Sequence, residues 1–170
     1  MRAVDDRDVV LTTPRLVLTS WVPGDVGPLL EVHSDPESMR FVRHGRPESR
    51  AETEQLIDHY ITEHAARGWT KWRLADPDGG LIGRAGFGGD AGERQIALLV
   101  RRSHWGRGLA TEIAEALVDW HRTHAEGATL TALAAVGNHA SISVLKKVGF
   151  VDTGAEDYDG VPCRSFVHPS

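Results

Sequence analysis

The stretch Leu98–Glu112, LLVRRSHWGRGLATE, decides the fold of this chain. An apolar strand runs into a turn with two glycines, and the turn opens directly into a helix. Gly106 and Gly108 let the backbone come close to a ligand. The unpaired N–H groups of the first helical turn then point at that ligand, with the positive end of the helix dipole behind them. The stretch therefore predicts a phosphate-binding site.

Three arginines of this stretch, Arg101, Arg102 and Arg107, add positive charge in a chain whose net charge is -5. The alternative interpretation is a tight strand–helix turn with incidental glycines. The stretch is not a P-loop, because no Gly-Lys-Ser/Thr follows the glycine turn. It is not a dinucleotide fingerprint, because the G-x-G-x-x-G spacing is missing.

The composition indicates one ordinary globular domain. The 170 residues are 41% hydrophobic and 25% charged, which argues against disorder and low complexity. With 19 Lys and Arg among 170 residues and a net negative charge, nucleic acid is not an expected partner. The single cysteine, Cys163, excludes an internal disulfide and a CxxC zinc site.

The ends of the chain lack targeting signals. No apolar run reaches the ~18 residues of a membrane-spanning helix, and the first ten residues have no apolar signal-peptide region. We therefore expect a cytoplasmic protein without a membrane partner. We expect a frayed tail over residues 1–8 and a single domain over residues 9–170.

Along the rest of the chain, hydrophobic periodicity predicts four helices and seven strands in a mixed order. The helices are predicted at 26–33, 49–66, 108–124 and 139–147, and the strands at 15–21, 69–75, 81–87, 95–101, 129–136, 150–153 and 164–167. Asp25 is expected to cap the first helix, and Gly68 to end the second. Gly83, Gly86 and Gly88 are interpreted as a bulged strand. This order predicts an α+β fold, one sheet covered by helices on both faces.

Four segments, in this order, resemble the GNAT superfamily of N-acetyltransferases, in particular its RimJ/RimL type. They are the opening strand LTTPRLVL (11–18), the hairpin strand LIGRAGF (81–87), the loop WGRGLATE (105–112) and the helix with the following strand NHASISVLKKVGF (138–150). The resemblance implies a mostly antiparallel, mixed sheet of six to seven strands that splays between residues 95–101 and 129–136. It also implies that acetyl-CoA is the cofactor and lies in that splay.

The resemblance implies specific cofactor contacts. Backbone groups of Leu99, Val100 and Arg101 would pair with the pantetheine arm, and an N–H near Leu99 would stabilise the thioester oxyanion. Lys147 or Arg107 would meet the phosphates. The cofactor-binding residues expected from it are Leu99, Val100, Arg101, Trp105, Gly106, Arg107, Gly108, Leu109, Ala110, Thr111, Asn138, Ser141 and Lys147. Trp105 is expected to pack under the loop, with stacking on CoA as the alternative.

The sequence departs from the family at two catalytic positions. Many relatives have a tyrosine seven residues after the asparagine, as proton donor to the leaving thiolate, where this chain has Leu145. Ser141 is then the remaining donor, with an ordinary helix serine as the alternative, and Asn138 would hold the arm beside it. Relatives often have a glutamate where Gln95 stands, and a glutamine cannot act as a base. Deprotonation through water, or by a loop carboxylate or imidazole, is therefore expected.

The acceptor implied by the resemblance is a primary amine, carried by a protein N-terminus or by a small molecule. His33, Arg43, His44 and Gln95 are the candidate acceptor contacts. The histidine pairs His59 with His64 and His121 with His124 lack a third ligand, so no metal site is expected. The alternative function is a CoA-binding domain without catalysis, and the expected assembly is a monomer or a homodimer.

Overall fold

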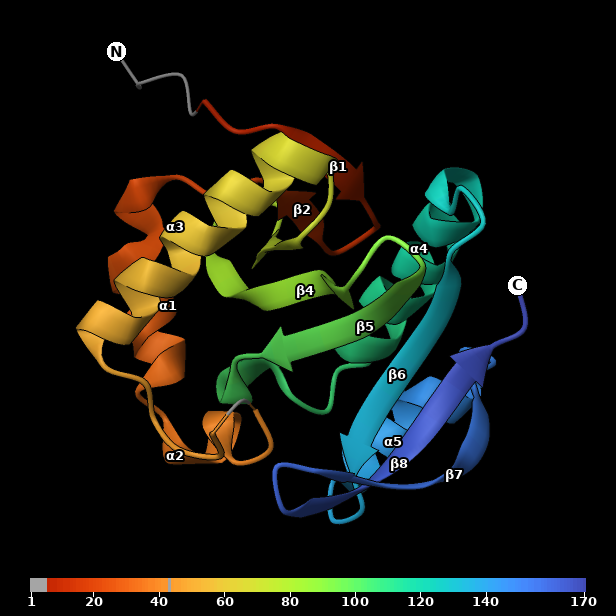
Figure 1. The fold of residues 1–170 in the computed structure, drawn as a ribbon. Helices are drawn as coiled ribbons and strands as arrows, with labels where there is room; N and C mark the ends of the chain where they lie inside the picture. Colours follow the sequence, from red (N-terminus) through yellow and green to blue (C-terminus); the bar gives the residue numbers. More distant parts are fainter. Residues whose placement is uncertain (1–5, 43) are drawn as a thin grey trace.

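The computed structural model describes residues 6–42 and 44–170. Eight strands form one sheet in the order β1-β2-β3-β4-β5-β6-β8-β7 (Figure 1). The strands are β1 (Val9–Thr12), β2 (Val17–Thr19), β3 (Lys71–Ala75), β4 (Leu81–Gly89), β5 (Glu93–Val100), β6 (Thr129–Ala135), β7 (Val151–Tyr158) and β8 (Val161–His168). The predicted number of six to seven strands is wrong by one. Strand β1 was missed because it has only four residues and follows a run of charges.

Helices cover both faces of the sheet, as predicted. They are η1 (Pro23–Asp25), α1 (Val26–His33), α2 (Pro36–Met39), α3 (Arg50–Arg67), η2 (Arg102–His104), α4 (Leu109–His124) and α5 (His139–Lys147). Helices α1 and α3 lie on one face, and α4 and α5 on the other (Figure 1). The buried apolar residues accordingly form two clusters, one on each side of the sheet.

Local sequence signals set the bounds of the long helix α3. The Ser49 hydroxyl accepts a hydrogen bond from the Glu52 N–H, and the Glu52 carboxylate accepts one from the Ser49 N–H. Gly68 ends the helix in the left-handed region at φ 78°, as predicted. The predicted cap at Asp25 is wrong, because its carboxylate makes no cap bond to α1. It pairs instead with Arg73 at 3.2 Å and with Arg7.

The start of the chain is held in place from Arg7 onward. Besides the ion pair of Arg7 with Asp25, Asp8 exchanges two hydrogen bonds of 2.9 Å with Ser20, backbone to backbone and backbone to side chain. Arg7 and Asp8 therefore have partners in the structure, residues 1–5 lie outside the described residues, and the frayed tail over residues 1–8 stays a prediction. Fraying was expected because this segment is highly charged, but Arg7 and Asp8 both contact other residues of the fold.

Two glycines of β4 let the strand backbones approach closely. A Cβ on Gly83 would lie 1.9 Å from the Leu99 carbonyl oxygen, and one on Gly86 would lie 2.1 Å from that of Thr70. The register between β4 and β5 is continuous, and the only irregularity of β4 faces β3, beside Leu74. Strand β4 is therefore bulged, as interpreted, only on the side that pairs with β3. The end of β5 is held tightly against β4.

The sheet opens between β5 and β6. These parallel strands pair only over Glu93–Gln95 and Thr129–Thr131, and beyond those residues they diverge (Figure 1). The opening therefore lies beside the carboxyl-terminal halves of both strands. No helix in the described part of the chain has the length and apolar character needed to cross a membrane.

Candidate active site

A cavity of about 630 Å³ opens beside the diverging halves of β5 and β6. Its wall is formed by α2 and the residues after it, the end of β5, the glycine turn, the start of α4, and α5 with the loop before it. The lining residues are Glu37, Ser38, Arg40, Phe41, Val42, Leu98, Leu99, Val100, His104, Trp105, Gly106, Gly108, Leu109, Ala110, Thr111, Gly137, Asn138, His139, Ala140, Ser141, Ser143, Val144 and Lys147.

The glycine turn presents backbone donors to this cavity. Gly106 and Gly108 both have φ 76°, a left-handed conformation that favours glycine. The first backbone bond of α4 runs from the Glu112 N–H to the Gly108 carbonyl, and no side chain caps the helix. The N–H groups at the start of α4 therefore have no partner within the helix and lie where the cavity is. Such a donor set fits phosphate oxygens.

Successive residues of β5 direct their backbone N–H and C=O groups alternately to β4 and to the opening. Arg101 donates its N–H to the Ile82 carbonyl of β4 at 2.7 Å, and Leu99 lies opposite Arg84. By the alternation of an antiparallel pair, Leu99 and Arg101 direct their backbone groups to β4, and Leu98 and Val100 direct theirs to the opening. The expectation that Leu99 and Arg101 offer backbone groups to a ligand is therefore not met. Val100 does offer them, and Leu98 was missed.

Trp105 already bonds to one of these groups. Its indole Nε1 donates to the Val100 carbonyl at 2.7 Å, while the side chain stays half exposed at the cavity. The indole thus covers the end of β5 beside the glycine turn. This contact favours the expected packing of Trp105 under the loop over the alternative, in which the indole is free to stack on CoA.

The three arginines of the turn do not line the cavity. Arg101 pairs with Glu31 of α1 at 2.9 Å, and Arg102 with Asp35 at 3.2 Å. Arg107 donates to the Ser103 carbonyl at 3.3 Å. Arg101 and Arg102 thus tie the turn to α1 and α2. Lys147, which was expected to meet a phosphate, is exposed on the cavity wall.

Asn138 and Ser141 lie together at the start of α5. The Asn138 Oδ1 caps the helix by accepting from the Ser141 N–H at 3.3 Å, and both residues line the cavity. Leu145, one turn further on, is 3% exposed and belongs to the hydrophobic core. A hydroxyl donor on α5 is therefore Ser141 or Ser143, the two serines that reach the cavity.

Among the predicted acceptor contacts that the structure describes, His33, His44 and Gln95 do not line the cavity. His33 is fully buried, with its Nδ1 3.0 Å from the Thr53 hydroxyl. Gln95 lies where β5 still pairs with Thr131, before the strands diverge. Arg43 lies outside the described residues.

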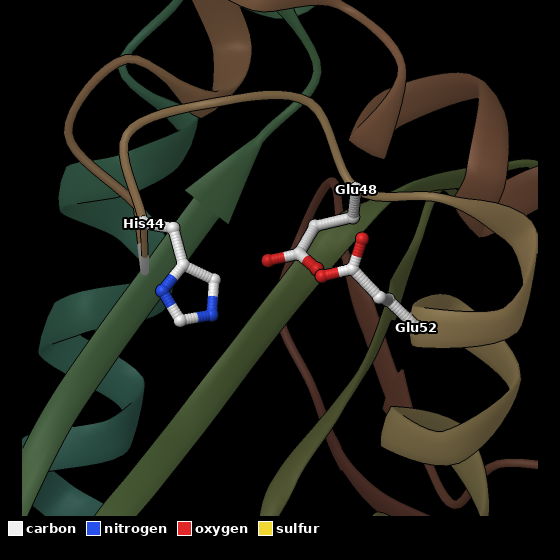
Figure 2. Close-up of side chains that lie close together, drawn as sticks. All are labelled: His44, Glu48 and Glu52. Carbon is white, nitrogen blue, oxygen red and sulfur yellow. The ribbon is translucent and has the colours of Figure 1, made fainter.

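His44 belongs to a different cluster. Figure 2 shows its imidazole turned toward the carboxylates of Glu48 and Glu52, and the possible donor atoms of the three lie within 4.8 Å of one another. Arg46, however, holds both Glu52 oxygens, at 3.1 and 3.0 Å. The side-chain hydrogen bond from Arg46 lowers the pKa of Glu52 well below its usual range. The Glu52 carboxylate of this cluster is therefore already paired with Arg46.

The wall formed by α2 and the residues after it was not expected from the sequence. Asp35 caps this short helix by accepting from the Ser38 N–H at 3.3 Å, a signal that the Ser-Asp-Pro sequence contains. The Phe41 ring then lies 3.5 Å from where a Cβ on Gly137 would stand. Phe41 and Gly137 thus close one end of the cavity from opposite sides of the opening.

An ion pair fixes the glycine turn to the start of the chain. Glu112 accepts from the Thr13 hydroxyl at 2.6 Å and from Arg15 Nε at 2.8 Å, and Arg15 donates to the Arg107 carbonyl at 2.7 Å. Burial raises the pKa of Glu112, but the hydrogen bonds from Thr13 and Arg15 outweigh it, so the pKa is lowered. The turn that presents the backbone donors is therefore held in place from outside.

Together the fold and this site define a class: proteins that hold an extended, phosphate-bearing cofactor between two diverging parallel strands. The comparisons with known proteins agree. The family profile described as an acetyltransferase (GNAT) domain matches residues 15–151. The chain is 27% identical over 145 residues to YkkB of Bacillus subtilis, covering 82% of this chain and 83% of that one.

Solved structures share the fold. A GnaT-family acetyltransferase from Bordetella pertussis superposes with a TM-score of 0.78 at 24% identity, over 95% of this chain and 99% of that one. RimL, a ribosomal L7/L12 alpha-N-protein acetyltransferase, has a TM-score of 0.83 at 17% identity, over 99% and 97%. The chain belongs to the GNAT acetyltransferase family, and it is an N-acetyltransferase that uses acetyl-CoA.

Proposed function

We propose that this enzyme moves the acetyl group directly from acetyl-CoA to a primary amine held at the α2 side of the cavity. The observation that carries the proposal is the cavity itself. It joins a helix N-terminus with free N–H donors to the unpaired edge of β5 and to a separate wall from α2. Two substrates can therefore meet there from two sides, and holding both in line accounts for much of the barrier reduction.

The residues present would hold the cofactor by its polar groups. The N–H groups from Gly106 to Ala110 would bind the pyrophosphate, and Lys147 would meet a phosphate. The Val100 N–H and the backbone groups of Leu98 would pair with the pantetheine arm. Asn138 would hold the arm from the α5 side. Acetyl-CoA, when bound, supplies the activated acetyl group.

The charges that develop during transfer have candidate partners. A backbone N–H of β5 directed to the opening, at Val100 or Leu98, would stabilise the thioester oxyanion. The Ser141 hydroxyl would protonate the leaving thiolate, since Leu145 cannot. Side chains on the cavity wall that can accept the amine proton are Glu37, His104 and His139. Burial and the nearby Arg107 and Arg101 lower the pKa of His104, so its imidazole is neutral near pH 7.

One neighbour with this fold names its acceptor class, because RimL is described as an alpha-N-protein acetyltransferase. A protein N-terminus is therefore one candidate acceptor for this chain, and a small-molecule amine is the other.

Release of free CoA thiol tests the proposal. Acetyl-CoA is incubated with the enzyme and a panel of peptide and small-molecule amines, and thiol is measured against an amine-free reaction. Amine-dependent release with an N-acetylated product supports the proposal. Cofactor binding without turnover on any amine would favour the rival function, a CoA-binding domain without catalysis.

A further inference from the structure

The backbone carbonyl of Arg107, in the middle of the glycine turn, is held by a side chain from outside the cavity. The Arg15 guanidinium donates to this carbonyl through Nη1 at 2.7 Å, and to the Glu112 carboxylate through Nε at 2.8 Å. Its Nη2 lies 3.6 Å from where a Cβ on Gly108 would stand. One planar group therefore contacts both the turn and the start of α4.

The contact with Arg15 fixes the direction of a backbone donor. The Arg107 carbonyl and the Gly108 N–H belong to one planar trans peptide, so they point in opposite directions. Because the carbonyl faces Arg15, the N–H is turned away from it, to the side on which Gly108 lines the cavity. Within residues 6–42 and 44–170 no hydrogen bond uses this N–H. It is therefore available to a phosphate oxygen.

The peptide between Arg107 and Gly108 needs such a contact because glycine hardly opposes its rotation. Half a turn would move Gly108 from its left-handed φ of 76° to a negative φ, a region open to every residue. The chain path would change little, but the Arg107 carbonyl oxygen would replace the N–H on the cavity side. The negative end of that peptide dipole would then face a phosphate and weaken its binding.

We propose that Arg15 is a positioning residue for the cofactor: it holds the Arg107 carbonyl and thereby keeps the Gly108 N–H directed at the pyrophosphate. The inference rests on the placement of the pyrophosphate at this turn in the proposed function. Arg15 lies between β1 and β2, 92 residues before Arg107. The affinity for the cofactor therefore depends on a contact between distant parts of the chain.

A purely electrostatic role is the alternative, because the Arg15 side chain is 49% exposed and carries a positive charge. That charge is balanced by the Glu112 carboxylate, which Nε contacts at 2.8 Å. An exposed ion pair attracts a third charge only weakly, and salt screens the attraction. The carbonyl contact of Nη1, in contrast, acts on the backbone itself. The geometry therefore favours positioning.

Calorimetric titration of CoA into Arg15→Gln tests the inference without any turnover. We expect the Kd of CoA to rise about 10-fold, in line with the loss of one hydrogen bond from a charged donor. The rise should persist at about 0.5 M salt, where charges more than roughly 4 Å apart are screened. Arg164→Gln is the matched control, since it removes a similarly exposed pair with Asp152. Its Kd should stay within about 2-fold of wild type.

Glu112→Gln separates the carbonyl contact from the ion pair. It removes the charge of Glu112 and leaves the Arg107 carbonyl within reach of Arg15, so it should weaken CoA binding by less than about 3-fold. An unchanged Kd in Arg15→Gln would overturn the inference. So would a loss in Arg15→Gln that Glu112→Gln reproduces in full, or one that disappears as salt is added.

The Gly108 amide signal in heteronuclear NMR spectra reports directly on the N–H. In the wild-type protein CoA should move the amide proton downfield, as expected of a hydrogen bond to phosphate, and in Arg15→Gln this shift should be much smaller. Equal shifts in the two proteins would overturn the role of Arg15 and leave the pyrophosphate placement intact. A wild-type Gly108 amide that does not respond to CoA would remove that placement and this inference with it. Neither readout involves an amine, so thiol release tests amine acetylation separately.

Discussion

Gly106 and Gly127 are two glycines with the same backbone conformation, and only the first lies in the cofactor turn. Both have left-handed backbone, with φ 76° and 86°, and a Cβ on either would meet open space. Valine at either position should cost about 1–3 kcal/mol of stability through backbone strain. Only Gly106→Val should weaken acetyl-CoA binding, by about 10-fold or more, because only Gly106 lies in the cofactor turn. Calorimetric titration beside thermal unfolding checks this, and equal cofactor affinity in the two variants would refute the role of the turn.

Ser141 and Ser143 offer a second comparison, because both line the cavity on α5. If the Ser141 hydroxyl protonates the leaving thiolate, Ser141→Ala should lower kcat about 10- to 100-fold and leave the KM for acetyl-CoA nearly unchanged. Ser143→Ala serves as the control and should retain its kcat. Steady-state kinetics decides, and an unchanged kcat in Ser141→Ala would assign the thiolate proton to another donor.

At the scale of elements, the Glu112 contacts should govern the stability of the cofactor turn in acid. The lowered pKa means that Glu112 stabilises the fold fully above its unfolded pKa of about 4.3, and that this contribution is lost as the pH falls through the folded value. Glu112→Gln should cost about 1–2 kcal/mol at pH 7. Its deficit should shrink below pH 4 in denaturant titrations. A deficit that stays constant with pH would show that the charge of Glu112 is irrelevant.

The cofactor turn could be predicted from sequence because its determinants are local. Two glycines and a helix start lie within a few residues of each other, and their conformation follows from those residues. The facing of β5 could not be predicted in this way. Whether Leu99 or Val100 points into the opening depends on the register with Gly83 of β4. Sequence alternation gives the period of two but not which residues face a particular neighbour.

Contacts between distant segments escaped prediction for the same reason. Phe41 meets Gly137 only because α2 ends where the β6–α5 loop begins, and neither segment indicates the other. His33 was expected at the acceptor wall, yet it lies inside α1 against Thr53. The positive charge of Arg101 and Arg102 was assigned to phosphate, but both pair with acids of the α1–α2 segment. The sequence shows that the arginine side chains need negatively charged partners, but it does not show which groups those partners are.

For the whole molecule, the two halves of the sheet are joined by a short seam, since β5 and β6 pair over only three residues. Acetyl-CoA lying between them should stabilise the folded state by about 2.7 kcal/mol at 100 times its Kd. Thermal unfolding followed by far-ultraviolet circular dichroism should show a Tm that rises with cofactor concentration. Free adenine would be the control and should leave the Tm unchanged.

We expect acetyl-CoA to lie in the opening between β5 and α5, with its pyrophosphate at the start of α4. The decisive measurement is a crystal structure of the CoA complex. Pyrophosphate oxygens should then lie within hydrogen-bond distance of the N–H groups of Gly106 to Ala110, and the thiol end beside Val100 and Ser141. A pyrophosphate bound elsewhere, or a pantetheine arm outside the opening, would contradict it.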